Sequence, residues 1–459
     1  MLRLQAERYG QCYESNIKMN FKIDKQTAND LELFEKSKGD NSIFSLFNLT
    51  KSIGGKDELQ RIFSVPFSDI DQIENRIELI RFFQNPLATI EIDKNILDLI
   101  EYYLSRKIDS STFSYSQSYS KALKNMIWPG NEYYILQRGV KYLIKSLNEL
   151  HTFAITIRSQ QIPDTVNNFI KTILETIENS SLKIVLSLKN KGKLYPHEYT
   201  NLNTIFRRNE ISGVRKLLQT VYEIDVYTSI AVASKNRGFT FPTFTKESNY
   251  LETKEIFHPF INNPVANDFV LTSDKRVCFI TGPNMAGKST FLKTLGISIY
   301  LSHLGFPVPA KSFKTSVFNG LFTTINLADN LSIGYSHYYN EVLRVKHVAE
   351  QINKGGNFFI VFDELFRGTN IKDAYEASLA VIEAFSNLTR SVFALSTHII
   401  EVAEKLKDNS FIFFKFFEAN LIEGNPQYNY QIKDGVTHER IGMYILNKEK
   451  VLETINNNN

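Results

Sequence analysis

The stretch Gly282–Ser289 constrains this chain more than any other part of it. It contains Gly-Pro-Asn-Met-Ala-Gly-Lys-Ser, follows the apolar run Val277–Ile280 and leads into a helical stretch, Lys288–Leu304. Glycines let backbone N–H groups curl around phosphate oxygens, and the start of a helix adds positive potential. The order strand, loop, helix is the context that a phosphate-binding loop needs. We therefore predict such a loop, with an ordinary glycine-rich turn as the alternative.

Two side chains of this stretch suit a nucleotide triphosphate with its Mg²⁺. Lys288 supplies a positive charge to the β- and γ-phosphates, and the Ser289 hydroxyl can ligate Mg²⁺. ATP and Mg²⁺ are the expected cofactors. The residues expected to bind them are Gly282, Pro283, Asn284, Met285, Ala286, Gly287, Lys288, Ser289 and Thr290.

Two more apolar runs, Phe358–Phe362 and Val392–Leu395, end in polar residues. Asp363 directly follows the first run, where a phosphate-loop enzyme holds Mg²⁺. Glu364 is then placed to polarise an attacking water as a general base, although an acid pair capping a helix is the alternative. His398, just beyond the second run, is placed to contact the γ-phosphate or the water, or else is a structural histidine.

The apolar patterning predicts two kinds of domain. Runs without alternation suit buried strands of a parallel sheet, and helical stretches separate them, which indicates an α/β domain over residues 241–459. Residues 22–240 consist of amphipathic helical stretches, such as Asp69–Phe83 and Asn201–Ala233, and residues 1–21 form an N-terminal arm. The predicted fold class is an all-α domain followed by a nucleotide-binding domain with a mainly parallel sheet.

Composition limits the setting of the chain. A net charge of +4 excludes a globally basic nucleic-acid binder but allows a local basic patch. Cys12 and Cys278 are too few for a disulfide framework or a thiolate zinc site, and no apolar stretch is long enough to span a membrane. We expect a cytoplasmic protein without a membrane partner. The basic residues that could contact nucleic acid, unless they are only a solvated face, are Lys189, Lys191, Lys193, Arg207 and Arg208.

Two motifs carry a resemblance to a known family. Thr281–Thr290 and the later stretch Asp363–Thr369, which contains Asp-Glu, two residues and Arg-Gly-Thr, resemble the ATPase domain of the MutS mismatch-repair family. Gly334–Glu341 is similar to the signature loop of that family, which places Ser336 in it, and His398 falls on its switch histidine. Weaker likenesses, beginning at Thr27, extend through the helical half.

The resemblance implies a helical core and lever domain followed by an ABC-type P-loop ATPase domain. It implies a homodimer with two composite sites, in which Ser336 reaches the γ-phosphate of the partner. The sequence departs from the family pattern at Tyr335, where arginine is usual, and at Pro264, which stands where the family usually has an aromatic residue that stacks on adenine. About twenty residues precede the resemblance, so we expect neither a mismatch-recognition nor a connector domain, and a reduced or missing clamp.

The expected function is that of an ATP-dependent DNA-binding protein in DNA repair or recombination, with DNA favoured over RNA. Hydrolysis of ATP to ADP and phosphate would reset helical levers that ATP binding moves. Two alternatives remain open: a ribosome- or RNA-associated quality-control ATPase, and a nucleotide-gated scaffold. The presence of Lys288, Asp363 and Glu364 together argues against the scaffold.

Overall fold

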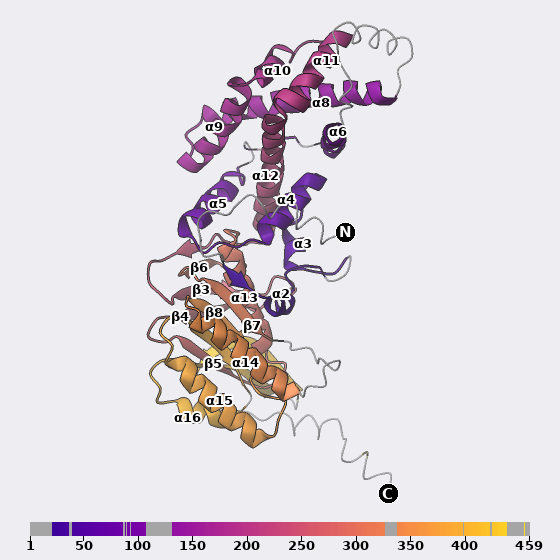
Figure 1. The fold of residues 1–459 in the computed structure, drawn as a ribbon. Helices are drawn as coiled ribbons and strands as arrows, with labels where there is room; N and C mark the ends of the chain where they lie inside the picture. Colours follow the sequence, from indigo (N-terminus) through magenta and orange to yellow (C-terminus); the bar gives the residue numbers. More distant parts are fainter. Residues whose placement is uncertain are drawn as a thin grey trace. The chain divides into compact units, whose positions relative to one another are not determined.

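The computed structural model describes residues 21–35, 39–85, 88, 90, 91, 93–106, 131–325, 337–397, 399–422, 425–437 and 454. Contacts divide the chain into two compact units (Figure 1). The sheet unit contains the chain up to Leu31, Val65–Ile73 and everything from Phe241 onward. The helical unit contains Glu32–Ser64 and Glu74–Thr240. The helical domain predicted over 22–240 thus differs from the helical unit at its beginning and over Val65–Ile73.

The helical unit has no strand among its described residues. Its helices bury apolar residues at a spacing of three or four, as Ile170, Ile173 and Ile177 do along α9. Helices α8 and α9 pack together, and α12 packs against α4. The helices of this unit are α3 (Ile43–Phe47), α4 (Ile53–Phe63), most of α5 (Ile70–Phe82), α6 (Lys94–Ser105), α8 (Asn131–Arg158), α9 (Asp164–Glu178), α10 (Ile184–Ser187), α11 (Pro196–Thr204) and α12 (Ile211–Asn236), with a short 3₁₀ turn η2 (Ser181–Lys183).

One predicted helical stretch is interrupted in the structure. Residues 201–233 divide into the end of α11, a π-helix η3 (Ile205–Asn209) and α12. The side chain of Glu210, at the junction, accepts a hydrogen bond from the backbone N–H of Ser181 at 3.0 Å. The apolar spacing on both sides of the junction is helical, so periodicity alone gave no sign of this break.

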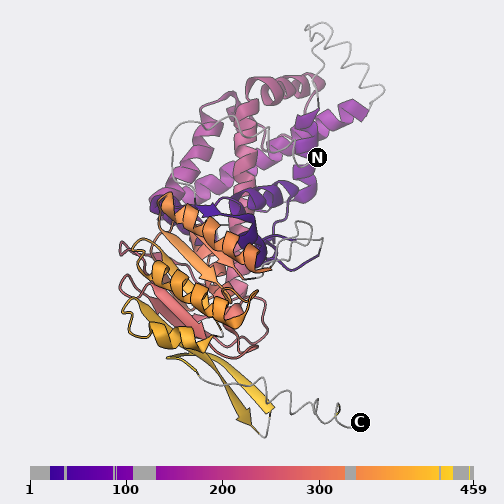
Figure 2. The ribbon, with the colours of Figure 1, turned by 60° about the horizontal axis from the view of Figure 1, so that its bottom comes forward.

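The sheet unit is built on a seven-stranded sheet in the order β1-β7-β8-β9-β5-β10-β11. All its neighbouring strands are parallel except the hairpin of β10 and β11, which Figure 2 shows as two long arrows. The mainly parallel sheet and three of its predicted strands, β5, β8 and β9, are confirmed. The strands are β1 (Lys22–Ile23), β5 (Val277–Thr281), β7 (Gly320–Thr324), β8 (Phe358–Phe362), β9 (Val392–Ser396), β10 (Ile412–Ile422) and β11 (Asn425–Asp434).

Helices cover both faces of this sheet. Phe279, Phe362 and Phe393 form one buried core with side chains from helices α14 (His337–Asn353), α15 (Ile371–Ser386) and α16 (Ile400–Leu406). Helix α13 (Lys288–His303) packs against β7, β8 and β9, and its Phe291 contacts Phe417 with 5.8 Å between the ring centroids. The predicted helix after the phosphate loop is therefore present.

A second, four-stranded sheet of this unit was not predicted. Its order is β2-β6-β3-β4, with antiparallel pairing of β3 to both β4 and β6. In strand β3 only every second residue at its start is buried, so no continuous apolar run marks it in the sequence. The strands are β2 (Thr243–Phe244), β3 (Leu251–Ile256), β4 (Asn267–Leu271) and β6 (Ser312–Thr315).

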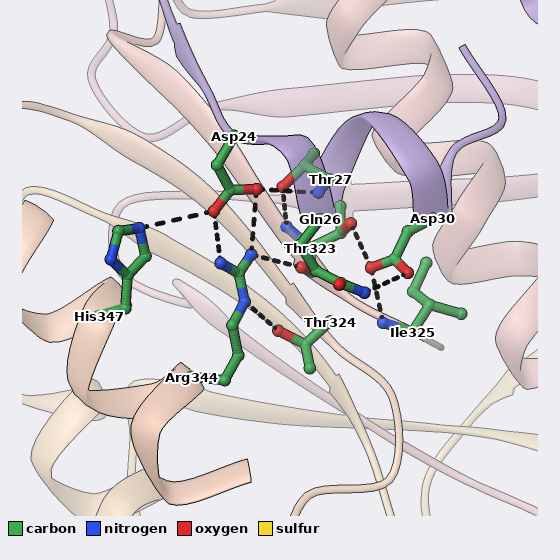
Figure 3. A network of polar contacts seen from close by, with 9 residues as sticks. All are labelled: Asp24, Gln26, Thr27, Asp30, Thr323, Thr324, Ile325, Arg344 and His347. Carbon is green, nitrogen blue, oxygen red and sulfur yellow. Dashed lines mark hydrogen bonds and ion pairs between the residues drawn. The ribbon is translucent and has the colours of Figure 1, made fainter. Parts of the chain in front are cut away.

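The edge of strand β7 is covered by the start of the described chain (Figure 3). Strand β1 pairs in parallel with it, with Lys22 opposite Gly320. Helix α2 (Lys25–Asp30) follows β1, and its side chains take over where the strand pairing ends. The backbone N–H of Thr323 donates to Thr27 Oγ1 at 2.9 Å, and that of Ile325 donates to Asp30 Oδ2 at 2.9 Å. These contacts explain why this segment groups with the sheet unit.

Candidate nucleotide-binding site

The predicted phosphate loop joins strand β5 to helix α13. Three of its residues, Gly282, Met285 and Gly287, have a positive φ, at 142°, 68° and 108°. A Cβ atom on Gly282 would lie 2.7 Å from the carbonyl oxygen of Phe417, so only glycine fits there. No side chain caps the start of α13, and unsatisfied N–H groups at such an end suit an anion.

Lys288 points back into this loop. Its ammonium group donates to the carbonyl oxygens of Gly282 at 2.8 Å and of Pro283 at 3.0 Å. Burial lowers the pKa of Lys288, and the charges of Glu364 and Asp363 oppose that shift. The loop therefore holds a desolvated cation near two carboxyl groups.

Asp363 and Glu364 follow strand β8, the neighbour of β9. The backbone N–H of Asp363 donates to the carbonyl oxygen of Thr324 at 2.8 Å, and the Ser396 hydroxyl donates to Asp363 Oδ1. Burial raises the pKa of Asp363, against hydrogen bonds from Ser289 and Ser396 that lower it. Glu364 adopts a φ of 55°, and its backbone N–H donates to the carbonyl oxygen of Ser396 at 3.1 Å.

The loop and the acid pair open onto one pocket. Its volume is about 620 Å³, and Lys288, Ser289, Asp363 and Glu364 all line it. Much of the remaining wall comes from residues within 256–265, including Pro264, and from Phe417 and Tyr430 of the β10–β11 hairpin. The structure thus brings the predicted phosphate-binding, metal-binding and general-base residues together.

The donor atoms in this pocket suit Mg²⁺ that arrives with a nucleotide. Asp363 and Ser289 offer a carboxylate and a hydroxyl, which are the hard oxygen ligands that Mg²⁺ prefers. Nowhere in the described ranges do three His, Cys, Asp or Glu side chains gather as a metal cage. Mg²⁺ is commonly held by one or two carboxylates together with substrate phosphates, so this donor set fits.

Two of the predicted site residues, Ser336 and His398, lie outside the described residues. The helix that follows Ser336 does reach the acid loop. The backbone N–H of Gly368, in the Arg-Gly-Thr stretch, donates to Glu341 Oε2 at 3.2 Å. A Cβ atom on Gly368 would lie 2.6 Å from the backbone nitrogen of Tyr338, so helix α14 approaches that loop closely.

Comparison with known protein families assigns both halves of the chain. The family model described as MutS domain III matches residues 26–231, and that described as MutS domain V matches residues 278–458. The two matches together cover most of the chain. The chain belongs to the MutS family.

Curated relatives agree with this MutS assignment. The DNA mismatch repair protein MutS of Listeria monocytogenes serotype 4b (strain CLIP80459) is 29% identical over 287 residues, which are 59% of this chain and 33% of that protein. The protein of the same name from Bacillus subtilis (strain 168) is 29% identical over 290 residues, with the same two shares. That from Petrotoga mobilis (strain DSM 10674 / SJ95) is 27% identical over 268 residues, 56% of this chain and 32% of that protein. The chain spans about a third of the length of these relatives.

The predicted basic residues fall into two separate groups in the part that matches MutS domain III. Lys189 Nζ donates to Thr152 Oγ1 at 3.0 Å, whereas Arg207 donates to the carbonyl oxygen of Arg106. Arg106 lies 4.0 Å from Glu132, at the other end of α8 from Thr152. Thr152 lies twenty positions after Glu132, so the two groups are about 30 Å apart along that helix.

The individual basic side chains also differ in their surroundings. Arg207 lies over the ring of Tyr103, 5.2 Å from its centroid, and burial lowers its pKa. Lys191 pairs with Glu198 at 2.5 Å. Lys193 and Arg208 are exposed.

A groove of about 750 Å³ runs beside Lys189 and Lys191. Sequence reasoning missed two of its lysines, Lys141 and Lys145, which lie on α8. Their spacing of four residues places both on one face of the helix, which could have been read as a basic stripe. The groove also contains Glu149, whose pKa is raised by burial, against the charge of Lys145.

In the part that matches MutS domain V, sequence reasoning missed Ser396 and Tyr430. Ser396 stands two residues before His398, and in this stretch only the histidine was predicted as a site residue. Tyr430 lies on strand β11, where no local motif marks a binding residue. Its ring is 3.4 Å from where a Cβ of Gly287 would be, so it forms part of the pocket by tertiary contact alone.

None of the helices in the described ranges is both long and apolar enough to cross a membrane.

Proposed function

We propose that this MutS-family chain is a Mg²⁺-dependent ATPase that converts ATP and water to ADP and phosphate. The observation that carries the proposal is the shared pocket of Lys288, Ser289, Asp363 and Glu364. The loop Gly282–Thr290 holds the triphosphate, with Lys288 exchanging its carbonyl partners for phosphate oxygens. Asp363 and Ser289 hold Mg²⁺, which neutralises charge that develops on the transferred phosphoryl group.

Glu364 orients the attacking water and accepts its proton. Its backbone is fixed by Ser396, and its carboxylate lies 3.6 Å from the guanidinium of Arg367. In the proposal His398 contacts the γ-phosphate or the water, and the ATPase domain is of the ABC type. Two subunits form composite sites, each with Ser336 from the partner, because an isologous interface makes two equal sites. ATP binding then moves the helical levers by differential contacts in the two states.

The proposed partner is nucleic acid, DNA rather than RNA, and the proposed setting is DNA repair in the cytoplasm. The names of the relatives support DNA mismatch repair as the process. The groove beside α8 supports a contact surface, because Lys141, Lys145, Lys189 and Lys191 border it. Lysines pair with phosphates without reading sequence, which suits recognition of distorted or branched DNA by shape.

Hydrolysis is tested first on the full chain. Wild type should release phosphate from ATP only with Mg²⁺. Lys288→Ala should lose nucleotide binding, whereas Glu364→Gln should keep binding and retain unhydrolysed ATP. Lys293→Ala, an exchange on α13 outside the pocket, is the control for both measurements. If Glu364→Gln turns over ATP at the wild-type rate, the role of Glu364 is wrong.

Nucleic-acid contact is tested by anisotropy with branched DNA, duplex DNA and structured RNA at one stated salt concentration. Lys141→Ala and Lys189→Ala should each weaken DNA binding about equally for all sequences and make it less sensitive to salt. Lys171→Ala is the control, since Lys171 lies 3.7 Å from Glu175 on α9, away from the groove. Tighter binding to RNA than to any DNA would favour the ribosome- or RNA-associated alternative.

The composite site is tested by mixing two inactive variants. A Lys288→Ala subunit still offers Ser336, and a Ser336→Ala subunit still binds ATP. The mixture should recover about one working site per heterodimer. A mixture that forms heterodimers but stays inactive would show that Ser336 does not act on the partner.

A further inference from the structure

The end of strand β7 is held by charged side chains from two helices of the sheet unit (Figure 3). Arg344 of α14 and Asp24, which caps helix α2, meet beside Thr323 and Thr324. Neither Asp24 nor Arg344 has a part in the proposed ATPase chemistry. Thr324, which Arg344 contacts, is nevertheless also bonded through its carbonyl oxygen to Asp363, the acid that would hold Mg²⁺.

Arg344 uses its whole guanidinium group. Nε donates to Thr324 Oγ1 at 3.1 Å, and Nη2 donates to the carbonyl oxygen of Thr323 at 2.7 Å. Nη1 donates to Asp24 Oδ2, and Nη2 also reaches Asp24 Oδ1 at 3.4 Å. The residue is only 9% exposed, so losing any of these partners would leave a buried charge with an unsatisfied donor.

Asp24 fixes Arg344 from the opposite side. It accepts a hydrogen bond from the backbone N–H of Thr27 at 2.8 Å as the N-cap of α2. Burial alone would raise the pKa of Asp24, but the hydrogen bond and charge of Arg344, together with hydrogen bonds from Thr27, outweigh it, so the pKa is lowered. Asp24 is therefore a charged anchor on a helix that is itself attached to β7 through Thr27 and Asp30.

Thr324 connects this cluster to the nucleotide pocket. Its side chain accepts from Arg344, and its carbonyl oxygen accepts from the backbone N–H of Asp363 at 2.8 Å. A shift of Thr324 would move the acceptor that sets the position of Asp363. On this side Asp363 is held by that backbone bond, and its carboxylate accepts hydrogen bonds from the hydroxyls of Ser289 and Ser396.

We infer that Arg344 is a positioning residue for Mg²⁺ binding at Asp363, and that Asp24, the N-cap of helix α2, holds Arg344 in place. The inference rests on the proposed function, because it assigns the supporting residues of that same site. A lysine cannot replace Arg344, since one ammonium cannot reach Thr324 Oγ1, the Thr323 carbonyl and Asp24 in the fixed geometry of a planar fork. Helix α2 thereby acts on the Mg²⁺ site through side chains that never touch the nucleotide.

The test measures Mg²⁺ dependence of nucleotide binding, which needs no hydrolysis. The full chain binds a fluorescent ADP analogue while Mg²⁺ is titrated, and the midpoint of the Mg²⁺ response is compared between variants. Arg344→Lys and Thr324→Val should each raise the midpoint at least threefold. Thr324→Ser keeps the hydroxyl acceptor and should restore the wild-type midpoint. Asp24→Asn keeps the helix cap but not the charge, and should shift the midpoint in the same direction.

His347→Ala is the matched control. His347 lies 3.6 Å from the same Asp24 carboxylate but is 44% exposed, and its dashed contact in Figure 3 goes to Asp24, not to Thr323 or Thr324. On β7 its ring lies edge-on to Phe322, with 6.2 Å between the ring centroids. Its removal should leave the midpoint unchanged. The Thr324 pair keeps the test decisive if Arg344→Lys does not fold.

Two failures can be told apart. If the wild type shows no Mg²⁺-dependent nucleotide binding, both the proposed function and this inference are overturned. If the wild type responds to Mg²⁺ but Arg344→Lys and Thr324→Val keep its midpoint while melting at lower temperature, the cluster is only structural. That result overturns the inference and leaves the proposed function standing.

Discussion

The side-chain amide of Asn267 holds the backbone of Tyr430. Its Nδ2 donates to the Tyr430 carbonyl oxygen at 3.0 Å, and its Oδ1 accepts from the backbone N–H of Ile432 at 2.8 Å. Asn267 is buried, and its side chain bonds strand β4 to the backbone of strand β11, in the way that the backbone of a neighbouring strand would. It also fixes Tyr430 with a φ of 55° and with 45% of its surface exposed in the pocket wall. An exposed ring on a strained backbone suggests a binding role.

Replacing Tyr430 should therefore separate stability from nucleotide affinity. Tyr430→Gly removes backbone strain and should stabilise the fold by about 1 kcal/mol. The same change removes an aromatic face and should weaken ATP binding about threefold to tenfold. Tyr430→Phe is the control and should bind like wild type. Inorganic tripolyphosphate, which has no base, should bind all three proteins equally; an equal loss for it would show that the ring does not contact the base.

Gly282→Ala should damage the site through contact with the hairpin. The added Cβ would lie 2.7 Å from the Phe417 carbonyl oxygen at a φ of 142°, so strand β10 must shift. We expect a loss of about 2 kcal/mol or more in unfolding free energy, measured by urea denaturation, together with loss of ATP binding. Gly355→Ala is the control, because Gly355 has a φ of 86° but no atom within 4 Å of its Cβ position. Equal losses in both variants would mean that backbone strain, not the contact, is responsible.

His303 should make the sheet unit less stable in acid. The ring is fully buried; its Nδ1 lies 2.8 Å from the Ile299 carbonyl oxygen and its Nε2 accepts from the backbone N–H of Phe318 at 2.9 Å. Burial lowers its pKa to about 4, against these backbone bonds. Because the folded pKa lies below the unfolded value, stability is complete above about pH 6.5 and falls as the pH drops toward 4.

The loss over that range should reach about 3 kcal/mol. His303→Gln cannot titrate there, so its unfolding free energy should change less steeply between pH 6.5 and 4, even though it starts lower at pH 7. Urea denaturation at a series of pH values measures both slopes. Parallel slopes for the two proteins would show that His303 does not titrate on unfolding.

Glu223 should have the opposite effect in the helical unit. Burial, with a smaller effect from Glu58, raises the pKa of Glu223 to about 6, against the charges of Arg61 and Arg76. A raised folded pKa means that stability is greatest below about pH 4.5 and is lost as the pH rises through 6. Glu223→Gln should remove this dependence and stabilise the protein at pH 7 by up to about 2 kcal/mol. Destabilisation of the variant at pH 7 would mean that the carboxylate is a net favourable partner of the two arginines.

Sequence patterns were sufficient where local physics decides the structure. Strands β5, β8 and β9 are buried on both faces, so each forms a continuous apolar run, and the phosphate loop has its own glycine spacing. Strand β1 has only Lys22 and Ile23, and it is a strand because β7 pairs with it from far along the chain. No short segment of the sequence contains both strands of this pair, so local patterning cannot predict it.

The same limit applies to the candidate site. Lys288, Asp363 and Glu364 follow strands that point to one edge, so their convergence could be predicted. Ser396 and Tyr430 could not be predicted as site residues, because neither a serine hydroxyl nor a tyrosine ring belongs to a local motif here. Only the folded structure shows which site residues they contact. The basic residues near Lys189 and Arg207 lie close together in sequence, yet in the structure they are about 30 Å apart along helix α8.

The edge pairing of β1 with β7 also sets the order in which this protein can mature on the ribosome. About 300 residues separate Lys22 from Gly320, its partner. At 5–20 residues per second, roughly 15 to 60 s pass between synthesis of the two. During that interval Asp30 lacks the amide of Ile325 that it later binds. A fragment beginning at Phe241 would expose β7 as a bare edge and should aggregate, whereas a synthetic peptide of residues 21–31 added during refolding should prevent that aggregation.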